Sequence, residues 1–116
     1  MEEGKLVNLG YLREATGDDD ELISEILQLF LEDTKEELAK LKSAVDDDRC
    51  QEVARIAHRL KSSMLNLGLE EVAQELLDIE KLIQSDGFCS HTKENVQRVL
   101  LSCQAVFLDV ERLLSS

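Results

Sequence analysis

Apolar side chains recur at steps of three and four residues along most of the chain, which is the period of an amphipathic α-helix. Short polar breaks, rich in aspartate and glycine, interrupt the pattern at 17–20, 46–48, 68 and 85–87. The pattern predicts one short helix followed by four long ones, at Asn8–Thr16, Asp19–Val45, Asp48–Leu67, Leu69–Ser85 and Thr92–Leu114. Four long helices with short loops predict an all-α fold: an antiparallel up-down-up-down four-helix bundle with a short additional N-terminal helix.

The segment 19–45 carries more apolar surface in its first half than one stripe requires. The extra stripe consists of Leu22, Ile26 and Leu29. Because apolar surface is stabilised by burial, we expect Leu9 and Leu12 of the short helix to cover it.

The composition is typical of a single helical domain spanning residues 1–116. The chain has no proline, and only 3% of its residues are aromatic. A net charge of −12 argues against nucleic acid or an anionic membrane surface as a partner. No segment approaches the ~20 apolar residues of a membrane span. The acidic N-terminus lacks the features of a secretory signal, so we expect a cytoplasmic protein and, by default, a monomer.

The three cysteines, Cys50, Cys89 and Cys103, show no CxxC spacing. Neither a disulfide framework nor a zinc site is therefore expected. Cys103 lies on an apolar stripe and is expected in the core.

The segment 48–67 carries a histidine on its polar side. Its apolar positions form one stripe about 100° wide, made of Val53, Ile56, Ala57, Leu60, Met64 and Leu67. His58 lies about 150° from the centre of this stripe, so we expect its imidazole to face solvent. Helical spacing places five residues beside it on this outer face: Ala54, Arg55, Lys61, Ser62 and Leu65. Ala54 and Ser62 are small enough to leave the imidazole accessible, and Leu65 indicates a contact surface.

Charge is unevenly distributed around His58. The stretch 49–66 contains four cations and a single acid, namely Arg49, Arg55, Arg59 and Lys61 against Glu52. In an acidic chain this basic cluster would offset the charge of a phosphoryl group and attract an acidic partner. An exposed histidine on an amphipathic helix is by default a solvated residue without a special role. The pattern indicates docking and phosphate binding, and leaves phosphoryl transfer open.

The run from Ala57 to Gly68 reads Ala-His-Arg-Leu-Lys-Ser-Ser-Met-Leu-Asn-Leu-Gly. It resembles the signature of histidine phosphotransfer (HPt) domains, approximately Ala-His-x-Leu-Lys-Gly-Ser-x-x-x-x-Gly. The resemblance extends from Leu9 to Gly87 and includes an Ile-Glu-x-x-Ile pattern at 79–83. Ser62 stands where the family usually has glycine. Because serine is also small, docking should survive, and the departure bears on the range of partners rather than on the activity.

The resemblance implies that His58 is phosphorylated and that Lys61 lies beside it and interacts with the phosphoryl group. It implies a partner as well, the receiver domain of a response regulator or hybrid sensor histidine kinase, whose aspartate and bound Mg²⁺ exchange the phosphoryl group. We expect the receiver to dock over Ala54, Arg55, Arg59, Ser62 and Leu65, and the chain itself to need no cofactor or metal. It has no glycine-rich nucleotide loop, so a phosphoryl carrier is expected rather than an ATP-dependent kinase.

The main alternative is a non-catalytic interaction bundle that binds a receiver or another partner without phosphorylation. A degenerate domain that inhibits receivers is disfavoured by the presence of both His58 and Lys61. A metal- or haem-binding bundle is disfavoured because His58 has no second ligand at helical spacing. His91 is expected to be a loop residue. Glu80 is either a solvated helix residue or the partner of a basic side chain.

Overall fold

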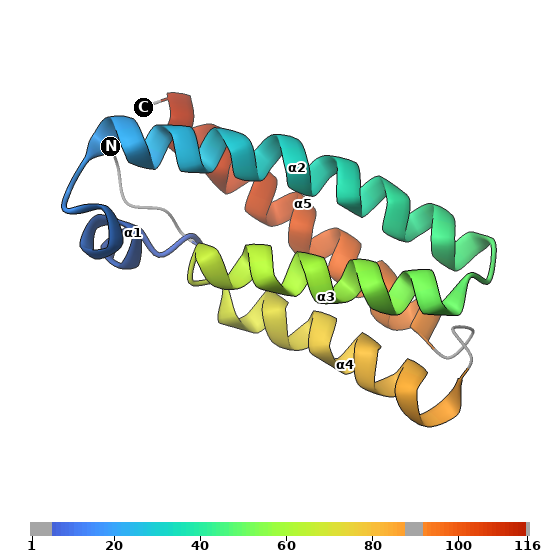
Figure 1. Cartoon of the computed structure of the whole chain (residues 1–116). Helices are drawn as coiled ribbons and strands as arrows, with labels where there is room; N and C mark the ends of the chain where they lie inside the picture. Colours follow the sequence, from blue (N-terminus) through green and yellow to red (C-terminus); the bar gives the residue numbers. More distant parts are fainter. Residues whose placement is uncertain (1–5, 88–91, 116) are drawn as a thin grey trace.

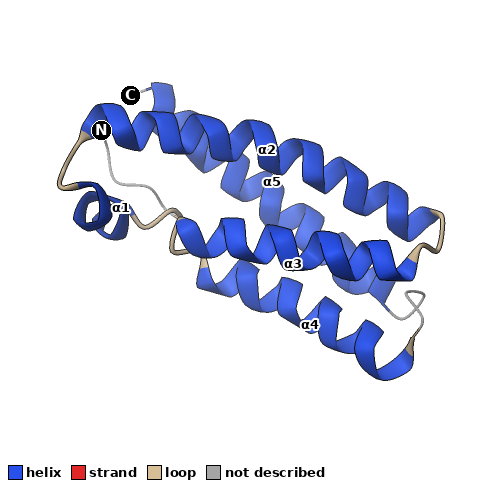
Figure 2. Ribbon diagram, in the orientation of Figure 1, coloured by secondary structure: helices blue, strands red, loops and turns tan. Residues whose placement is uncertain are grey.

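The structure is a computed structural model that describes residues 6–87 and 92–115. Each predicted helix is present, and the observed ends differ from the predicted ones by at most two residues. The helices are α1 (Leu9–Thr16), α2 (Asp20–Asp46), α3 (Cys50–Asn66), α4 (Glu70–Asp86) and α5 (Lys93–Ser115). Because the part of the chain that is described contains helices and no strands, the predicted all-α class is confirmed (Figure 2).

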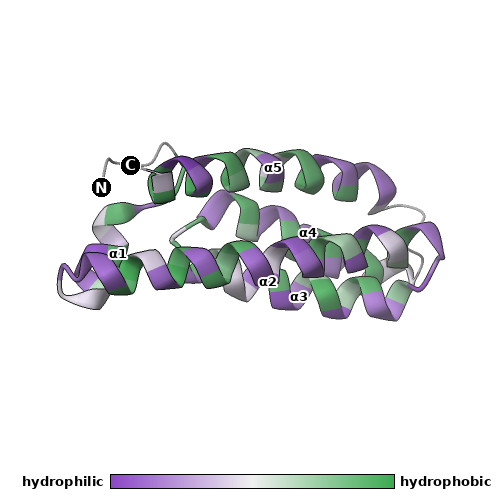
Figure 3. Ribbon diagram, turned by 90° about the horizontal axis from the view of Figure 1, so that it is seen from above, coloured by the Kyte–Doolittle hydropathy of each residue, from purple (hydrophilic) through white to green (hydrophobic). Residues whose placement is uncertain are grey.

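The four long helices run in alternating directions along one elongated body (Figure 1). Helix α2 packs against α3 and α5, and α4 packs against the same two helices, so the four form a closed ring around a shared core. Apolar segments alternate with polar ones along every helix, as an amphipathic bundle requires (Figure 3). The predicted up-down-up-down bundle is therefore confirmed.

Helix α1 lies against the N-terminal part of α2, near the turn that joins α3 to α4 (Figure 1). Leu9 and Leu12 are buried, as predicted. The extra stripe of α2 nevertheless stays largely open, since Leu22 is 40% and Leu29 is 59% exposed, and only Ile26 packs against the core. The predicted cover is therefore wrong for Leu22 and Leu29, because α1 crosses α2 instead of running along it.

The segment before α1 is anchored to the bundle at two places. The buried carboxylate of Asp109 on α5 accepts hydrogen bonds from the backbone N–H groups of Leu6 and Val7, at 3.0 Å each. Asn8 donates its backbone N–H to Leu67 at the end of α3. The anchored segment thereby brings Asn8 against Gly68. This glycine lies in the α3–α4 turn and has a φ of 71°.

Two cysteines lie in the described part of the chain. Cys103 is a free, buried thiol, and burial raises its pKa to about 12. Cys50 is disulfide-bonded, so the expectation of no disulfide is wrong at this position. Spacing rules detect metal and redox motifs, but they do not detect a bond between residues that only the fold brings together. Cys89 and His91 lie outside the described residues.

None of the helices in the described ranges combines the length and the apolar character needed to cross a membrane.

Candidate functional site

Helix α3 separates a buried stripe from an outer face, as its sequence predicts. The six apolar positions of the stripe, Val53, Ile56, Ala57, Leu60, Met64 and Leu67, are all buried. On the opposite side, the imidazole of His58 is 68% exposed. The predicted orientation of His58 is therefore confirmed.

Two side chains, Lys61 of α3 and Glu80 of α4, meet the imidazole of His58. His58 Nδ1 lies 3.1 Å from Oε1 of Glu80, and Oε2 of the same carboxylate accepts a hydrogen bond from Lys61 Nζ at 3.1 Å. Lys61 Nζ also lies 3.3 Å from Nδ1. Lys61 is 18% and Glu80 only 9% exposed, so the cluster is anchored below the surface while the imidazole stands above it.

The contacts of Nδ1 favour one tautomer of His58. A carboxylate can only accept hydrogen bonds, so the contact with Glu80 favours a proton on Nδ1. Lys61 Nζ could donate to Nδ1 only if Nδ1 carried no proton, but its contact is longer, at 3.3 Å, than the 3.1 Å contact with Glu80. In the tautomer that the Glu80 contact favours, Nε2 carries no proton and its lone pair is available to an electrophile.

An open hollow of about 490 Å³ lies beside the imidazole, between the N-terminal half of α3 and the C-terminal half of α4. It is lined by Gln51, Glu52, Ala54, Arg55, His58, Glu80 and Gln84. All of these residues except Ala54 are polar or charged, which suits a charged group or a partner surface better than an apolar ligand.

In the folded chain, carboxylates neutralise the four cations of the basic cluster. Each of its cations pairs with a carboxylate: Arg49 with Asp47, Arg55 with Glu52, Arg59 with Glu37 and Lys61 with Glu80. Glu37 lies on α2 and Glu80 on α4, so counting charges along α3 alone missed them. The expectation of a net positive island around His58 is therefore wrong.

Arg55 and its partner Glu52 lie on α3 before His58, Arg55 about one turn and Glu52 nearly two turns away. The hydrogen bond from Arg55 lowers the pKa of the Glu52 carboxyl, and the same bond raises the pKa of the Arg55 guanidinium. Both groups thus remain charged at neutral pH beside the hollow.

The predicted docking residues surround His58 but differ in accessibility. Ser62 and Leu65 are exposed, Leu65 at 46%, whereas Ala54 is half-buried against the core. Arg59 leans toward α2, where it meets Glu37 at 3.2 Å. The small residues one turn before and after His58 leave the imidazole clear, and a docking role for these positions stays a prediction.

Glu80 is the residue whose role the sequence left open. It flanks the buried stripe of α4, and its position gave the only signal: an acid next to Ile79 at the edge of an apolar stripe. Its distance to His58 depends on how α3 and α4 align, which periodicity does not specify. No group of three potential metal ligands occurs within residues 6–87 and 92–115.

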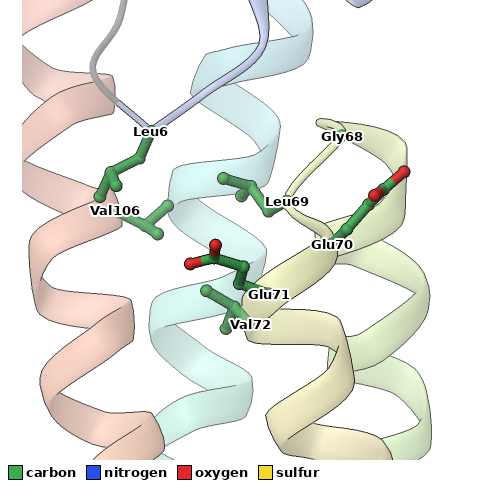
Figure 4. Close-up of a pocket in the computed structure, with 7 residues that line it drawn as sticks. All are labelled: Leu6, Gly68, Leu69, Glu70, Glu71, Val72 and Val106. Atoms are coloured by element: carbon green, nitrogen blue, oxygen red, sulfur yellow. The ribbon is translucent and has the colours of Figure 1, made fainter.

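A second hollow, of about 320 Å³, lies at the turn between α3 and α4. Figure 4 shows Leu6 and Val106 facing Leu69 and Val72, with the Glu71 carboxylate between them. None of the predicted site residues lines it, so it is separate from the His58 cluster.

Comparison with known proteins gives one match. The sequence model of the family described as Hpt domain matches residues 25–113, which is most of the chain and includes His58, Lys61 and Glu80. No curated protein and no solved structure matches the chain.

Proposed function

Since the chain belongs to the Hpt domain family, whose members carry out histidine phosphotransfer in two-component phosphorelays, we propose that His58 is its phosphoryl-carrying residue. In this proposal His58 accepts the group from the aspartate of a receiver domain and donates it to another. The observation that carries the proposal is the imidazole itself: 68% exposed, with Nδ1 engaged by Glu80 and Nε2 free.

The residues present suit a simple transfer step. Nε2 attacks the phosphorus of an aspartyl phosphate, a P–N bond forms, the P–O bond to the aspartate breaks, and the carboxylate leaves. The ring becomes positively charged and keeps its proton on Nδ1, where the Glu80 carboxylate stabilises it. No proton has to leave the imidazole, so the reverse transfer uses the same arrangement.

Lys61 balances the charge of this arrangement. Its ion pair with Glu80 neutralises a carboxylate that would otherwise repel the incoming phosphoryl group. Through the same positive charge Lys61 interacts favourably with the phosphoryl group. Mg²⁺ and the groups that catalyse in-line transfer would belong to the receiver. The chain then acts as a carrier, without cofactor or kinase activity of its own.

The receiver would approach the outer face of α3. Ser62 and Leu65 are the exposed predicted contacts on the C-terminal side of His58, and Ala54 and Arg55 lie on the N-terminal side. In this proposal the protein acts in the cytoplasm, where receiver domains and the kinase modules of sensor proteins meet. It acts as a monomer, in keeping with a net charge of −12 that opposes self-association.

Incubation with phosphorylated receiver domains and Mg²⁺ tests the proposal. We expect an acid-labile, alkali-stable label on the wild-type chain, no label on His58→Gln, and an undiminished label on His91→Gln, which removes the other histidine. Absence of label across a panel of receivers would reject phosphotransfer. A His58→Gln chain that still binds receivers and keeps the signalling output would support the interaction bundle instead.

A further inference from the structure

The free nitrogen of His58 determines where a phosphoryl group lies. Nδ1 is 3.1 Å from Glu80 and 3.3 Å from Lys61, so these two residues occupy one edge of the ring. The open hollow beside the ring is lined by Arg55 together with His58 and Glu80, so a phosphoryl group on the exposed imidazole has the Arg55 guanidinium in the same hollow. Side chains on a helix lean toward its N-terminus, so the ring leans toward the turn that carries Arg55.

Lys61 is not easily released toward that side. Its partner Glu80 is 9% exposed, and Lys61 itself is 18% exposed. The Glu80 carboxylate has two partners, His58 and Lys61. If Lys61 moved to the phosphoryl oxygens, this buried carboxylate would lose its only partner with a fixed positive charge among the two. Removing a partner from a buried ion pair is strongly unfavourable, so Lys61 remains with Glu80.

Arg55 is the more available cation. Its side chain is 49% exposed, and its partner Glu52 is 33% exposed. Arg55 donates two hydrogen bonds to the Glu52 carboxylate, but both groups are accessible to water, so releasing Arg55 costs less than releasing Lys61 from the buried Glu80. The planar guanidinium also donates two parallel hydrogen bonds, which match the oxygens of a phosphoryl group. The small Ala54 beside it leaves room for this movement.

We propose that Arg55 leaves Glu52 when His58 is phosphorylated and becomes the principal ligand of the phosphoryl oxygens. This inference rests on the proposed phosphorylation of His58. Glu52 then serves as the resting partner of Arg55, and Lys61 acts on the phosphoryl group only through its charge. After the exchange Glu52 loses the hydrogen bond that lowers its pKa.

Chemical phosphorylation tests this assignment without a receiver or a metal ion. With potassium phosphoramidate, the P–N bond of the reagent breaks, ammonia leaves, and phosphorus bonds to His58 Nε2. A ³¹P NMR titration then measures the pKa of the phosphoryl group, which a bound cation lowers.

We expect Arg55→Gln to raise the pKa of the phosphoryl group by about half a pH unit, the size of an exposed charge contact. Glu52→Gln removes the competitor for Arg55 and should lower the pKa of the phosphoryl group. The matched control is Arg49→Gln, since Arg49 is an exposed arginine at the start of the same helix and pairs with Asp47. Its loss should leave the titration unchanged.

An unchanged titration in Arg55→Gln would overturn the assignment, as would an equal shift in Arg49→Gln. A shift found in Lys61→Gln and absent from Arg55→Gln would make Lys61 the ligand. Failure of His58 to react with phosphoramidate would also overturn it, because Nε2 would not be free. A chain that shows the Arg55 shift yet takes no label from any receiver would reject the proposed function and support the Arg55 assignment.

Discussion

At the scale of single residues, the two ring nitrogens of His58 differ: Nδ1 contacts Glu80, and Nε2 is proposed to bind the phosphoryl group. The exposure of His58 followed from helical periodicity, because position around a helix is a local property of the sequence. The contact of Nδ1 with Glu80 could not be predicted in this way, because it depends on how α3 and α4 are aligned. The same reason explains why charge along α3 suggested a positive island: Arg59 and Lys61 are neutralised by acids on other helices.

Substitution of Glu80 tests its role in positioning the ring. We expect Glu80→Gln to slow phosphotransfer roughly 10- to 100-fold, because a hydrogen bond to a charged group contributes about 1.5–3 kcal/mol. Rapid-quench transfer from a phosphorylated receiver measures the rate. In ¹⁵N NMR, the wild-type ring should carry its proton on Nδ1 and the variant should show a mixture of tautomers.

Glu75→Gln is the matched control, since Glu75 is also on α4 but bonds Ser102 of α5. An equal loss of rate in both variants, with no change of tautomer in Glu80→Gln, would mean that Glu80 only supports the packing of α4.

The thiol of Cys103 predicts a dependence of stability on alkaline pH. Burial raises its pKa from 9.0 to about 12, so folding favours the protonated form. The resulting stability is fully present below pH 9 and is lost as the pH rises toward 12. Denaturant unfolding at pH 8 and pH 11 should show a smaller loss for Cys103→Val than for the wild type. Parallel losses would contradict this origin of the alkaline sensitivity.

At the scale of elements, the sequence predicted each helix and the order of the bundle, because amphipathic periodicity and turn residues are local signals. It did not predict how α1 is oriented, since the angle between two helices depends on side chains from both. That angle explains why Leu22 and Leu29 stay exposed. The sequence also did not predict that the segment before α1 is anchored, because Asp109 is about a hundred residues from the backbone N–H groups that it binds.

The contact between Asn8 and Gly68 can be tested with a pair of glycine variants. Gly68 and Gly17 both have positive φ, at 71° and 68°. A Cβ at Gly68 would lie 3.0 Å from Asn8 Cβ, whereas one at Gly17 would meet nothing within 4 Å. Gly17→Ala should therefore cost only the backbone strain of about 1–2 kcal/mol, and Gly68→Ala should cost more.

Urea unfolding measures both costs. Equal losses in Gly68→Ala and Gly17→Ala would show that the segment before α1 yields to the added methyl group and does not constrain the α3–α4 turn.

At the scale of the whole molecule, the proposed docking face has no excess of positive charge in a chain of net charge −12, because every cation of the basic cluster is paired with a carboxylate. Attraction of an acidic partner is then weaker than a count along α3 suggests. Steering during association depends on the local field as well as on net charge, so releasing one paired cation should change the association rate.

Glu37 and Glu36 separate these two contributions. Glu37 pairs with Arg59 at 3.2 Å, and Lys40 lies 3.6 Å from both Glu37 and Glu36, so the two carboxylates share Lys40 and differ in the contact with Arg59. Replacing either with glutamine removes one negative charge, but only Glu37→Gln frees Arg59 beside His58. For an acidic receiver we expect Glu37→Gln to raise the association rate about two- to threefold at low salt, measured by stopped flow, with the gain fading as salt screens the charge. Glu36→Gln should give a smaller gain. Equal gains would mean that net charge alone governs the encounter, and that the pairing of Arg59 with α2 has no influence on docking.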